Sequence, residues 1–210
     1  MKYRFITIEG NIGAGKTTLA YILSERLNAR LILEAFAENP FLPMFYENPK
    51  QYAFPLELFF MAERFKQLKE MLHSDDLFYN TTISDYLFTK CLLFAKTNLS
   101  EEEFKLYQKL FDIIHQQLIF PDLLIYLHTP VEKLKENIAK RGRPYEKNIG
   151  NDYLLKIQDI YLNYIRQHHI KTLMVDASNA DFLGNDEHVN LILDTLEKTD
   201  IKDKYFLTLP

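Results

Sequence analysis

The residues with the clearest chemical pattern lie near the start of the chain, where three glycines, a lysine and a threonine follow a fixed spacing. Residues 10–17 read GNIGAGKT, which matches the phosphate-loop pattern G-x-x-x-x-G-K-S/T in full. In such a loop, successive backbone N–H groups point at phosphate oxygens, and the following helix adds the positive end of its dipole. We therefore expect an ATP site made of Gly10, Asn11, Ile12, Gly13, Ala14, Gly15, Lys16, Thr17 and Thr18.

Two side chains of this loop have roles beyond the backbone cradle. Lys16 is expected to neutralise the β- and γ-phosphates as a catalytic cation, and the Thr17 hydroxyl to bind Mg²⁺. The alternative is a chance glycine loop between a strand and a helix. An apolar strand before the motif and an amphipathic helix after it favour nucleotide binding.

Two acidic residues end predicted strands. Glu34 follows the apolar run of residues 30–34, and Asp85 ends the run of residues 79–85. Ligands of open parallel sheets collect at the carboxyl ends of the strands. Glu34 can therefore accept the proton of a hydroxyl that attacks the γ-phosphate, and the alternative is a solvated strand-end residue. Asp85 can hold Mg²⁺ together with Thr17, cap a helix, or do both.

Arg141 and Arg143 flank a glycine directly after a predicted helix. Two arginines on such a mobile element can close over the phosphates, stabilise the charge of the transition state and exclude water. The alternative is a basic helix end that complements the helix dipole. We expect the first role in a chain that already holds a phosphate loop.

Short apolar runs alternate with longer amphipathic segments, which is typical of an α/β fold with a parallel sheet. Two helix starts resemble capping boxes, Ser100 with Glu103 and Thr129 with Glu132. No repeat or linker interrupts the pattern, so we expect one domain over residues 1–210. Five strands are predicted, at residues 3–9, 30–34, 79–85, 122–128 and 171–176.

Composition and charge limit the partners. The net charge is −4 over 210 residues, and a mildly acidic chain is poorly suited to bind a nucleic acid polymer. Cys91 is the single cysteine of the sequence, which excludes an intrachain disulfide and the common structural zinc sites. No apolar run approaches the length of a membrane span. We therefore expect no membrane partner and a cytoplasmic protein.

The phosphate loop leaves the acceptor of the phosphoryl group open. The N-K-x-D motif of GTPases is absent from the sequence, and the chain is small for a motor or transporter ATPase. These features favour a small-molecule kinase.

Beyond the phosphate loop, four further stretches resemble the deoxynucleoside kinase family, and the likeness extends to about Asp176. The family has a three-layer fold with a five-stranded parallel sheet flanked by helices and a short arginine-rich lid, here at about residues 140–150. The resemblance implies a homodimer and transfer of the γ-phosphate of ATP to the 5′-hydroxyl of a deoxyribonucleoside, for nucleotide salvage. The stretches are LEAFAENP at 33–40, FYENP at 45–49 with FPLELF at 54–59 and Arg64, SDY at 84–86, and KRGRPYE at 140–146.

By this resemblance, Tyr46 and Glu146 hold the sugar 3′-hydroxyl, while Glu57 and Arg64 lie in the base pocket. Four positions depart from the family pattern and bear on rate and base specificity. They are Glu57 in place of Gln, Cys91 in place of Asp, Tyr86 in place of Arg, and Asn137 in place of a lid Arg.

The departures at Glu57 and Cys91 favour a purine. An ionised Glu57 offers acceptors only, and guanine presents two adjacent donors to a single carboxylate. The small Cys91 leaves room for a purine and leaves Arg64 free to meet the guanine carbonyl oxygen. Adenine remains open if Glu57 is protonated or turned towards Lys90. We therefore predict purines ahead of pyrimidines, with deoxyguanosine slightly ahead of deoxyadenosine.

Two alternative functions, a nucleoside monophosphate kinase and a nucleotide sensor, stay open, and so does the homodimer. A nucleoside monophosphate kinase needs further arginines for its acceptor's phosphate, and Arg64 alone lies on the proposed acceptor helix. A non-catalytic nucleotide sensor is favoured by Tyr86 and Asn137, which each remove a cation, and disfavoured by Glu34. The aromatic-rich helices at residues 104–107 and 153–164 add to the expectation of a homodimer.

Overall fold

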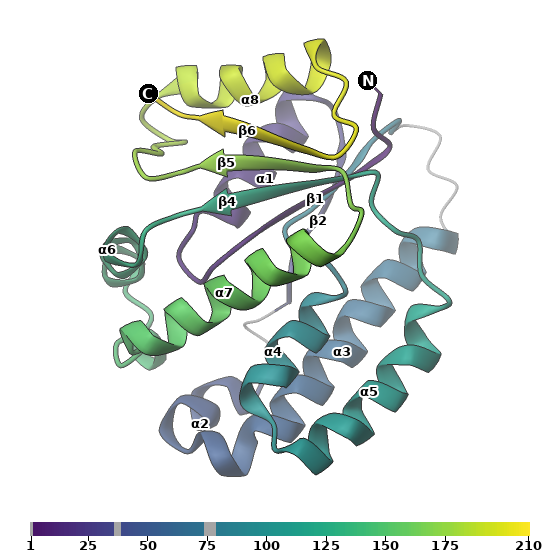
Figure 1. Cartoon of the computed structure of the whole chain (residues 1–210), viewed down its shortest axis with the longest axis vertical. Helices are drawn as coiled ribbons and strands as arrows, with labels where there is room; N and C mark the ends of the chain where they lie inside the picture. Colours follow the sequence, from purple (N-terminus) through teal and green to yellow (C-terminus); the bar gives the residue numbers. More distant parts are fainter. Residues whose placement is uncertain (1, 36–38, 74–78) are drawn as a thin grey trace.

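The sheet holds six parallel strands in the order β2-β3-β1-β4-β5-β6 (Figure 1). The computed structural model describes residues 2–35, 39–73 and 79–210, without the side chains of residues 71–73. Ile6 pairs with Ile83 on one side and with Leu123 on the other. The predicted α/β class with a parallel sheet is therefore confirmed. The strands are β1 (Phe5–Gly10), β2 (Arg30–Ile32), β3 (Thr82–Ser84), β4 (Leu123–His128), β5 (Thr172–Asp176) and β6 (Lys204–Thr208).

The prediction of five strands is wrong by one, because β6 was not foreseen. This strand pairs with β5 along its whole length at the edge of the sheet. Tyr205 and Phe206 are exposed, so β6 shows neither the continuous apolar run of a buried strand nor a clear alternation. Its backbone pairs with β5 and Leu207 packs against the core, but backbone pairing leaves no pattern in the side chains.

Two strands are shorter than predicted, and the difference places the acidic residues. β2 ends at Ile32 and β3 at Ser84, so Glu34 and Asp85 follow the last paired residues. Both side chains therefore lie at the carboxyl edge of the sheet, outside the backbone ladder.

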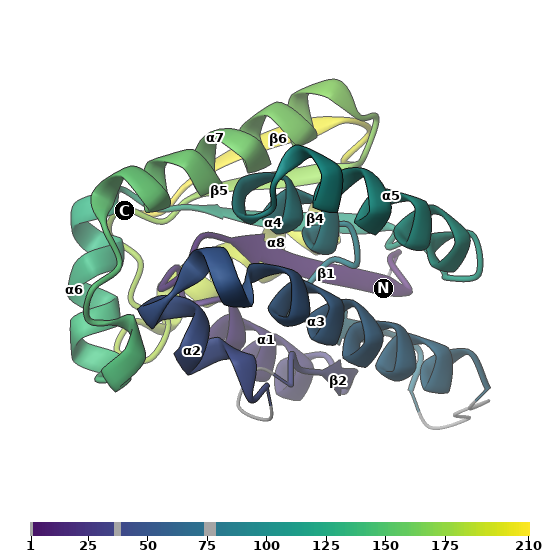
Figure 2. The same ribbon diagram turned by 90° about the horizontal axis from the view of Figure 1, so that it is seen from below.

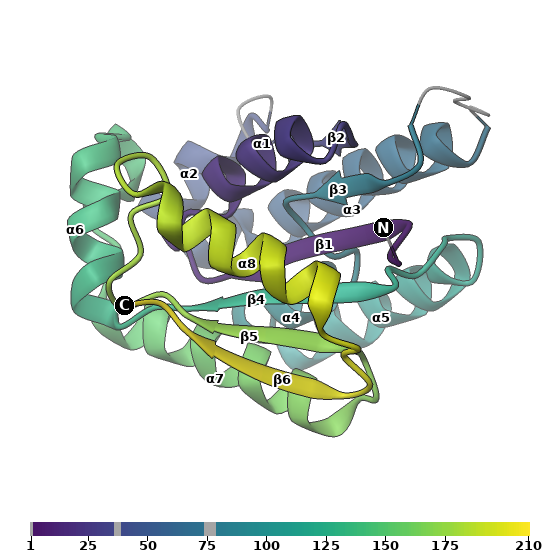
Figure 3. The same cartoon turned by 90° about the horizontal axis from the view of Figure 1, so that it is seen from above.

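Helices cover both faces of the sheet and give the predicted three layers. On one face lie α1 (Lys16–Arg26) and α8 (Asp186–Lys198) (Figure 3). The other face is covered by α3 (Pro49–His73), α4 (Lys90–Asn98), α5 (Glu101–His115) and α7 (Asn151–Gln167) (Figure 2). Beyond the carboxyl ends of the strands lies α6 (Val131–Arg141), with α2 (Phe41–Glu47) on the same side and the 3₁₀ helix η1 (Pro144–Glu146) next to α2.

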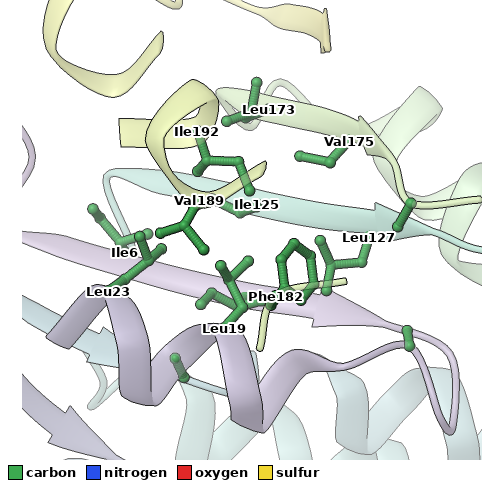
Figure 4. Close-up of a cluster of buried hydrophobic side chains, with 14 of the residues drawn as sticks. Ile6, Leu19, Leu23, Ile125, Leu127, Leu173, Val175, Phe182, Val189 and Ile192 are labelled. Atoms are coloured by element: carbon green, nitrogen blue, oxygen red, sulfur yellow. The ribbon is translucent and has the colours of Figure 1, made fainter. Parts of the chain in front are cut away.

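The core lies on both faces because successive strand residues point to opposite sides. On the second face, Leu124 and Tyr126 of β4 pack against Tyr161 of α7. This two-sided burial explains the near-continuous apolar runs of the central strands. On the first face, strand residues pack against α1, α8 and a loop phenylalanine (Figure 4). The residues of this cluster include Ile6, Leu19, Leu23, Ile125, Leu127, Leu173, Val175, Phe182, Val189 and Ile192.

One of the two predicted capping boxes is present. The Ser100 hydroxyl accepts from the Glu103 N–H, and the Glu103 carboxylate accepts from the Ser100 N–H. The second prediction is wrong. Pro130 is itself the N-cap of α6, so Thr129 stands one residue too early, and its buried hydroxyl has no hydrogen-bond partner among the described residues.

The aromatic residues behind the expectation of a homodimer face the core, which corrects that part of the argument. Tyr107 of α5 and Tyr161 of α7 are buried. The large apolar side chains that these helices do expose are Leu106, Ile113 and Leu155. Among the helices described, none combines the length and hydropathy that a bilayer span requires.

Candidate active site

The predicted site residues come together in one cleft at the carboxyl end of the sheet. The cleft encloses about 790 Å³, including its part open to solvent. Its lining comes from segments more than a hundred residues apart in the sequence. The predicted residues that line it are Lys16, Thr17, Glu34, Tyr46, Glu57, Arg64, Asp85, Arg141, Arg143 and Glu146, together with Ile12 and Gly13 of the phosphate loop.

The phosphate loop follows β1 and requires glycine at two of its turns. Gly13 and Gly15 have φ angles of 83° and 90°, a region that disfavours other residues. A Cβ atom at Gly13 would lie 2.9 Å from Ile138 Cγ1 and 2.9 Å from the Leu134 carbonyl oxygen. The loop therefore packs directly on α6, the helix that leads to the two lid arginines.

Part of the predicted ATP site faces away from the cleft. The Asn11 side chain donates to the Leu154 carbonyl oxygen of α7 at 2.7 Å, and Ala14 is buried in the core. These residues can contribute to nucleotide binding through their backbone, as the motif requires. The loop residues outside the lining of the cleft are Gly10, Asn11, Ala14, Gly15 and Thr18.

Lys16 points back at its own loop. Its Nζ donates to the carbonyl oxygens of Gly10 at 3.0 Å and Asn11 at 2.9 Å. Burial and the nearby charge of Lys90 lower the pKa of Lys16 to about 8. An anion at this position would restore the ordinary pKa, so the loop favours a phosphate group beside Lys16.

Asp85 joins two of the predicted functional residues. Its Oδ2 accepts from the Thr17 hydroxyl at 2.5 Å, and its Oδ1 accepts from the Glu34 N–H at 2.7 Å. The alternative role of Asp85 as a helix cap is wrong, because α4 begins only at Lys90.

The pair of Thr17 and Asp85 fits a magnesium ion. In nucleotide sites this ion usually binds one or two protein oxygens and takes its other ligands from phosphates and water. Among the described residues there is no cluster of three or more acidic, histidine or cysteine side chains that could hold a metal. The Thr17 hydroxyl and the Asp85 carboxylate lie side by side and match this arrangement with two protein oxygens.

Glu34 is held between two cations. Its Oε1 accepts from Arg64 Nε at 2.9 Å and from Arg64 Nη2, and its Oε2 accepts from Lys90 Nζ at 2.8 Å. Burial alone would raise the pKa of Glu34, but the charges of Lys90 and Arg64 hold it well below its usual range. The alternative of a solvated strand-end glutamate is therefore wrong, since the side chain is only 14% exposed.

Arg64 is bound on several sides, which corrects the expectation that it is free to meet a base. Besides its bonds to Glu34, its Nη1 lies 3.0 Å from Cys91 Sγ, and its guanidinium stacks over the Phe60 ring at 4.8 Å. The guanidinium thus links Cys91 of α4 to the carboxylate of Glu34.

Glu57 lies on α3 and lines the cleft. Its Oε1 accepts from Asn98 Nδ2 at 2.7 Å, and Asn98 Oδ1 accepts from the Tyr153 hydroxyl at 3.2 Å. Burial raises the pKa of Glu57 to about 7, although the Asn98 hydrogen bond opposes this. Glu57 is not turned towards Lys90, whose ammonium is bound to Glu34, so that one of the two conditions for adenine is not met here. Sequence reasoning missed Asn98 and Tyr153, which carry no local motif.

The arginines of the proposed lid share one partner. Arg141 Nη2 donates to Glu146 Oε2, and Arg143 Nη1 donates to Glu146 Oε1 at 3.1 Å. Gly142 has a φ of 73°, which ends α6 between the two arginines and turns both side chains to the cleft. Tyr46 stacks on Tyr145 with ring centres 5.9 Å apart, so the residue predicted to hold the sugar lies next to the lid.

The two positions that lack the expected arginines have structural partners. Tyr86 is buried, and its hydroxyl donates to Gln67 Oε1 at 2.8 Å. Asn137 Nδ2 donates to the Gly13 carbonyl oxygen at 2.9 Å and so ties α6 to the phosphate loop. Of the stretch at residues 33–40, residues 36–38 lie outside the described part of the chain.

Comparisons with known proteins agree with this geometry. The family model for deoxynucleoside kinases matches residues 6–201. The chain is 38% identical to deoxyguanosine kinase of Bacillus subtilis over 189 residues, covering 86% of this chain and 90% of that protein. It is 31% identical to deoxyguanosine kinase of Lactobacillus acidophilus over 201 residues, covering 91% and 88%.

A solved structure shows the same fold. The deoxyadenosine kinase from M. mycoides, with dATP bound, aligns with a TM-score of 0.80 at 25% identity, covering 93% of this chain and 100% of that one. The family match spans the phosphate loop, strands β1 to β5 apart from Phe5, and every residue that lines the cleft. The chain therefore belongs to the deoxynucleoside kinase family.

Proposed function

We propose that this protein transfers the γ-phosphoryl group of ATP to the 5′-hydroxyl of a purine deoxyribonucleoside, with deoxyguanosine ahead of deoxyadenosine. One observation carries the proposal: a phosphate loop, a buried carboxylate, two arginines and an acidic base-reading residue line the same cleft. Such a reaction serves nucleotide salvage, and the single cysteine fits a reducing compartment such as the cytoplasm.

At the phosphate end, the loop amides and Lys16 hold the ATP phosphates, while Thr17 and Asp85 hold Mg²⁺, which neutralises charge on the β- and γ-phosphates. Glu34 accepts the proton of the 5′-hydroxyl as that oxygen attacks the γ-phosphorus. Arg141 and Arg143 turn from Glu146 to the phosphates when the lid, at about residues 140–150, closes.

At the acceptor end, Tyr46 and Glu146 bind the sugar 3′-hydroxyl, and Glu57 reads the base. The bond from Asn98 fixes Oε1 of Glu57 and leaves the remaining lone pairs for a ligand. An ionised Glu57 then suits the N1–H and 2-amino donors of guanine. The two relatives named deoxyguanosine kinase support this preference.

The two other functions have less support. Arg64 lies at the acceptor end but is bound to Glu34 and Cys91, so it does not offer a second phosphate site to a nucleoside monophosphate. A mere sensor has no need for a buried carboxylate beside the phosphate loop. We also propose that the protein binds neither a nucleic acid polymer nor a membrane.

The first prediction tests the function itself. Purified protein with Mg²⁺ and ATP should convert deoxyguanosine, and more slowly deoxyadenosine, to the 5′-monophosphate, measured by chromatography against the two pyrimidine deoxynucleosides. Lys16→Ala should keep its circular dichroism spectrum and lose nearly all activity, because the ATP phosphates lose their main cation. Absence of any monophosphate with the wild-type protein would refute the proposal.

The second prediction concerns Glu34, the proposed acceptor of the hydroxyl proton. Glu34→Gln keeps the shape of the side chain but removes the proton acceptor, so turnover should fall by about 10²- to 10⁴-fold. The Kd of ATP should barely change, which calorimetry can check, and Glu25→Gln on the exposed side of α1 serves as the control. Turnover close to that of the wild type would move the role of base to another residue, with Asp85 the first to examine.

The third prediction concerns specificity. Glu57→Gln should shift the ratio of kcat/KM from deoxyguanosine towards deoxyadenosine by about 10- to 100-fold, because an amide offers a donor that adenine can use. The exposed Glu70→Gln on the same helix is the control. In the wild type, the guanine preference should be larger at pH 8 than at pH 6, because Glu57 ionises near pH 7. A ratio that changes with neither the variant nor the pH would show that Glu57 does not touch the base.

The fourth prediction is a homodimer. Leu106 and Ile113 on α5 are 53% and 64% exposed, and exposed apolar residues of this kind mark contacts. Light scattering at micromolar concentration should report twice the chain mass of 24.9 kDa. Ile113→Asp should lower the mass towards the monomer if α5 forms the contact. The monomer mass in the wild type would contradict the prediction.

A further inference from the structure

Lys90 brings into the cleft a positive charge that no sequence motif predicts. It is the first residue of α4, it lines the cleft, and its side chain is 7% exposed. Its ammonium donates to Glu34 Oε2 at 2.8 Å and lies 5.4 Å from the centre of the Phe94 ring. A lysine buried to this degree needs charged partners to stay in place.

Two carboxylates keep Lys90 charged. Besides Glu34, it faces Glu9 of β1, a buried residue whose oxygens accept from the Leu87 N–H and the Tyr161 hydroxyl, each at 2.8 Å. Burial would lower the pKa of Lys90, but the charges of Glu34 and Glu9 raise it above its usual value. Glu9 is held in place by Leu87 and Tyr161, so it stays near Lys90 when that lysine leaves Glu34, although burial raises the pKa of Glu9 itself.

Lys90 lines the same cleft as Gly13 and Lys16 of the phosphate loop. The two ammonium groups carry like charges and therefore repel each other there. A γ-phosphate placed beside Lys16 relieves this repulsion and attracts both cations. A γ-phosphate bound at the phosphate loop thus supplies the attraction that can draw Lys90 away from Glu34.

We propose that Lys90 is a catalytic residue whose ammonium leaves Glu34 Oε2 when ATP binds and then holds the γ-phosphoryl oxygens. This inference rests on the proposed function. In the transfer, the 5′-oxygen forms a bond to the γ-phosphorus, and the bond from that phosphorus to the β–γ bridging oxygen breaks. ADP leaves with the electron pair, Glu34 Oε2 takes the hydroxyl proton, and Lys90 keeps its own protons.

The movement of Lys90 frees one oxygen of Glu34 for the acceptor. Lys90 binds Oε2 and Arg64 binds Oε1, so once Lys90 has left, Oε2 can accept from the 5′-hydroxyl while Arg64 still holds Oε1. Lys90 also supplies a charge that Tyr86 cannot, since the Tyr86 side chain is buried against Gln67.

The first test measures binding and does not need turnover. The Kd values of ADP and of the β,γ-imido analogue of ATP are measured for Lys90→Gln, Lys90→Arg and the exposed Lys96→Gln on the same helix. Lys90→Gln should weaken the analogue by about 10- to 100-fold and leave ADP nearly unchanged, as expected for loss of a charge-assisted bond to the γ-phosphate. Lys90→Arg should keep most of the wild-type ratio, and Lys96→Gln all of it. An unchanged ratio in Lys90→Gln would overturn the proposal.

The second test measures turnover. Lys90→Gln should lower kcat by about 10²-fold, because the transition state loses a positive charge on the γ-phosphoryl oxygens. Lys90→Arg should keep part of the wild-type kcat, and the exposed Lys96→Gln all of it. A kcat of Lys90→Gln close to that of the wild type would contradict the proposal.

Thermal unfolding checks that each variant folds, and Lys90→Met, which keeps the length of the stem, replaces Lys90→Gln if that variant does not. A wild-type protein without kinase activity would overturn the proposed function, whereas the ratio of the two Kd values would still decide the role of Lys90.

Discussion

The arrangement of the cleft depends on the buried carboxylate of Glu34 between the guanidinium of Arg64 and the ammonium of Lys90. Each charge alone would be costly to bury, and removing one partner would leave the others uncompensated. Glu34 follows β2, Arg64 lies within α3 and Lys90 begins α4. Their attraction therefore fixes two helices against the carboxyl edge of the sheet. Arg64 also contacts α4 directly, because its Nη1 lies 3.0 Å from Cys91 Sγ.

Around this contact, the parallel sheet determines which residues can meet. All six strands run in one direction, so the segments that follow their carboxyl ends lie at one edge. The strand order reverses at β1, which has β3 on one side and β4 on the other, and such a switch point opens a crevice for a ligand. The phosphate loop follows β1, Asp85 follows β3, and the lid follows α6, the helix after β4. Gly13 lets α6 pack on the loop, so the lid starts close to the phosphates.

The two acidic residues Glu34 and Glu57 of the cleft differ in their surroundings. Glu34 lies between the cations Arg64 and Lys90, which hold its pKa well below its usual range. Glu57 meets the neutral amide of Asn98 and has a pKa near 7, because burial is not balanced there by a directly bound cation. Glu57 can therefore change its hydrogen-bonding character within the physiological range, whereas Glu34 stays ionised. The roles proposed for the two residues rest on position, since Glu34 is bonded to Asp85 beside Thr17 of the phosphate loop and Glu57 is bonded to Asn98.

The sequence by itself determined the phosphate loop, the parallel α/β class and the acidic residues at the strand ends, because each follows from a local pattern of glycines or of apolar residues. The family resemblance added Tyr46, Glu57, Arg64 and Glu146, and all four line the cleft. Only the tertiary structure showed the edge strand β6, which is held by backbone pairing, and the contacts among residues distant in sequence. Lys90 and Asn98 belong to the site through partners 56 and 41 residues away. No pattern of neighbouring residues encodes such a contact, because it depends on how the helices pack against the sheet.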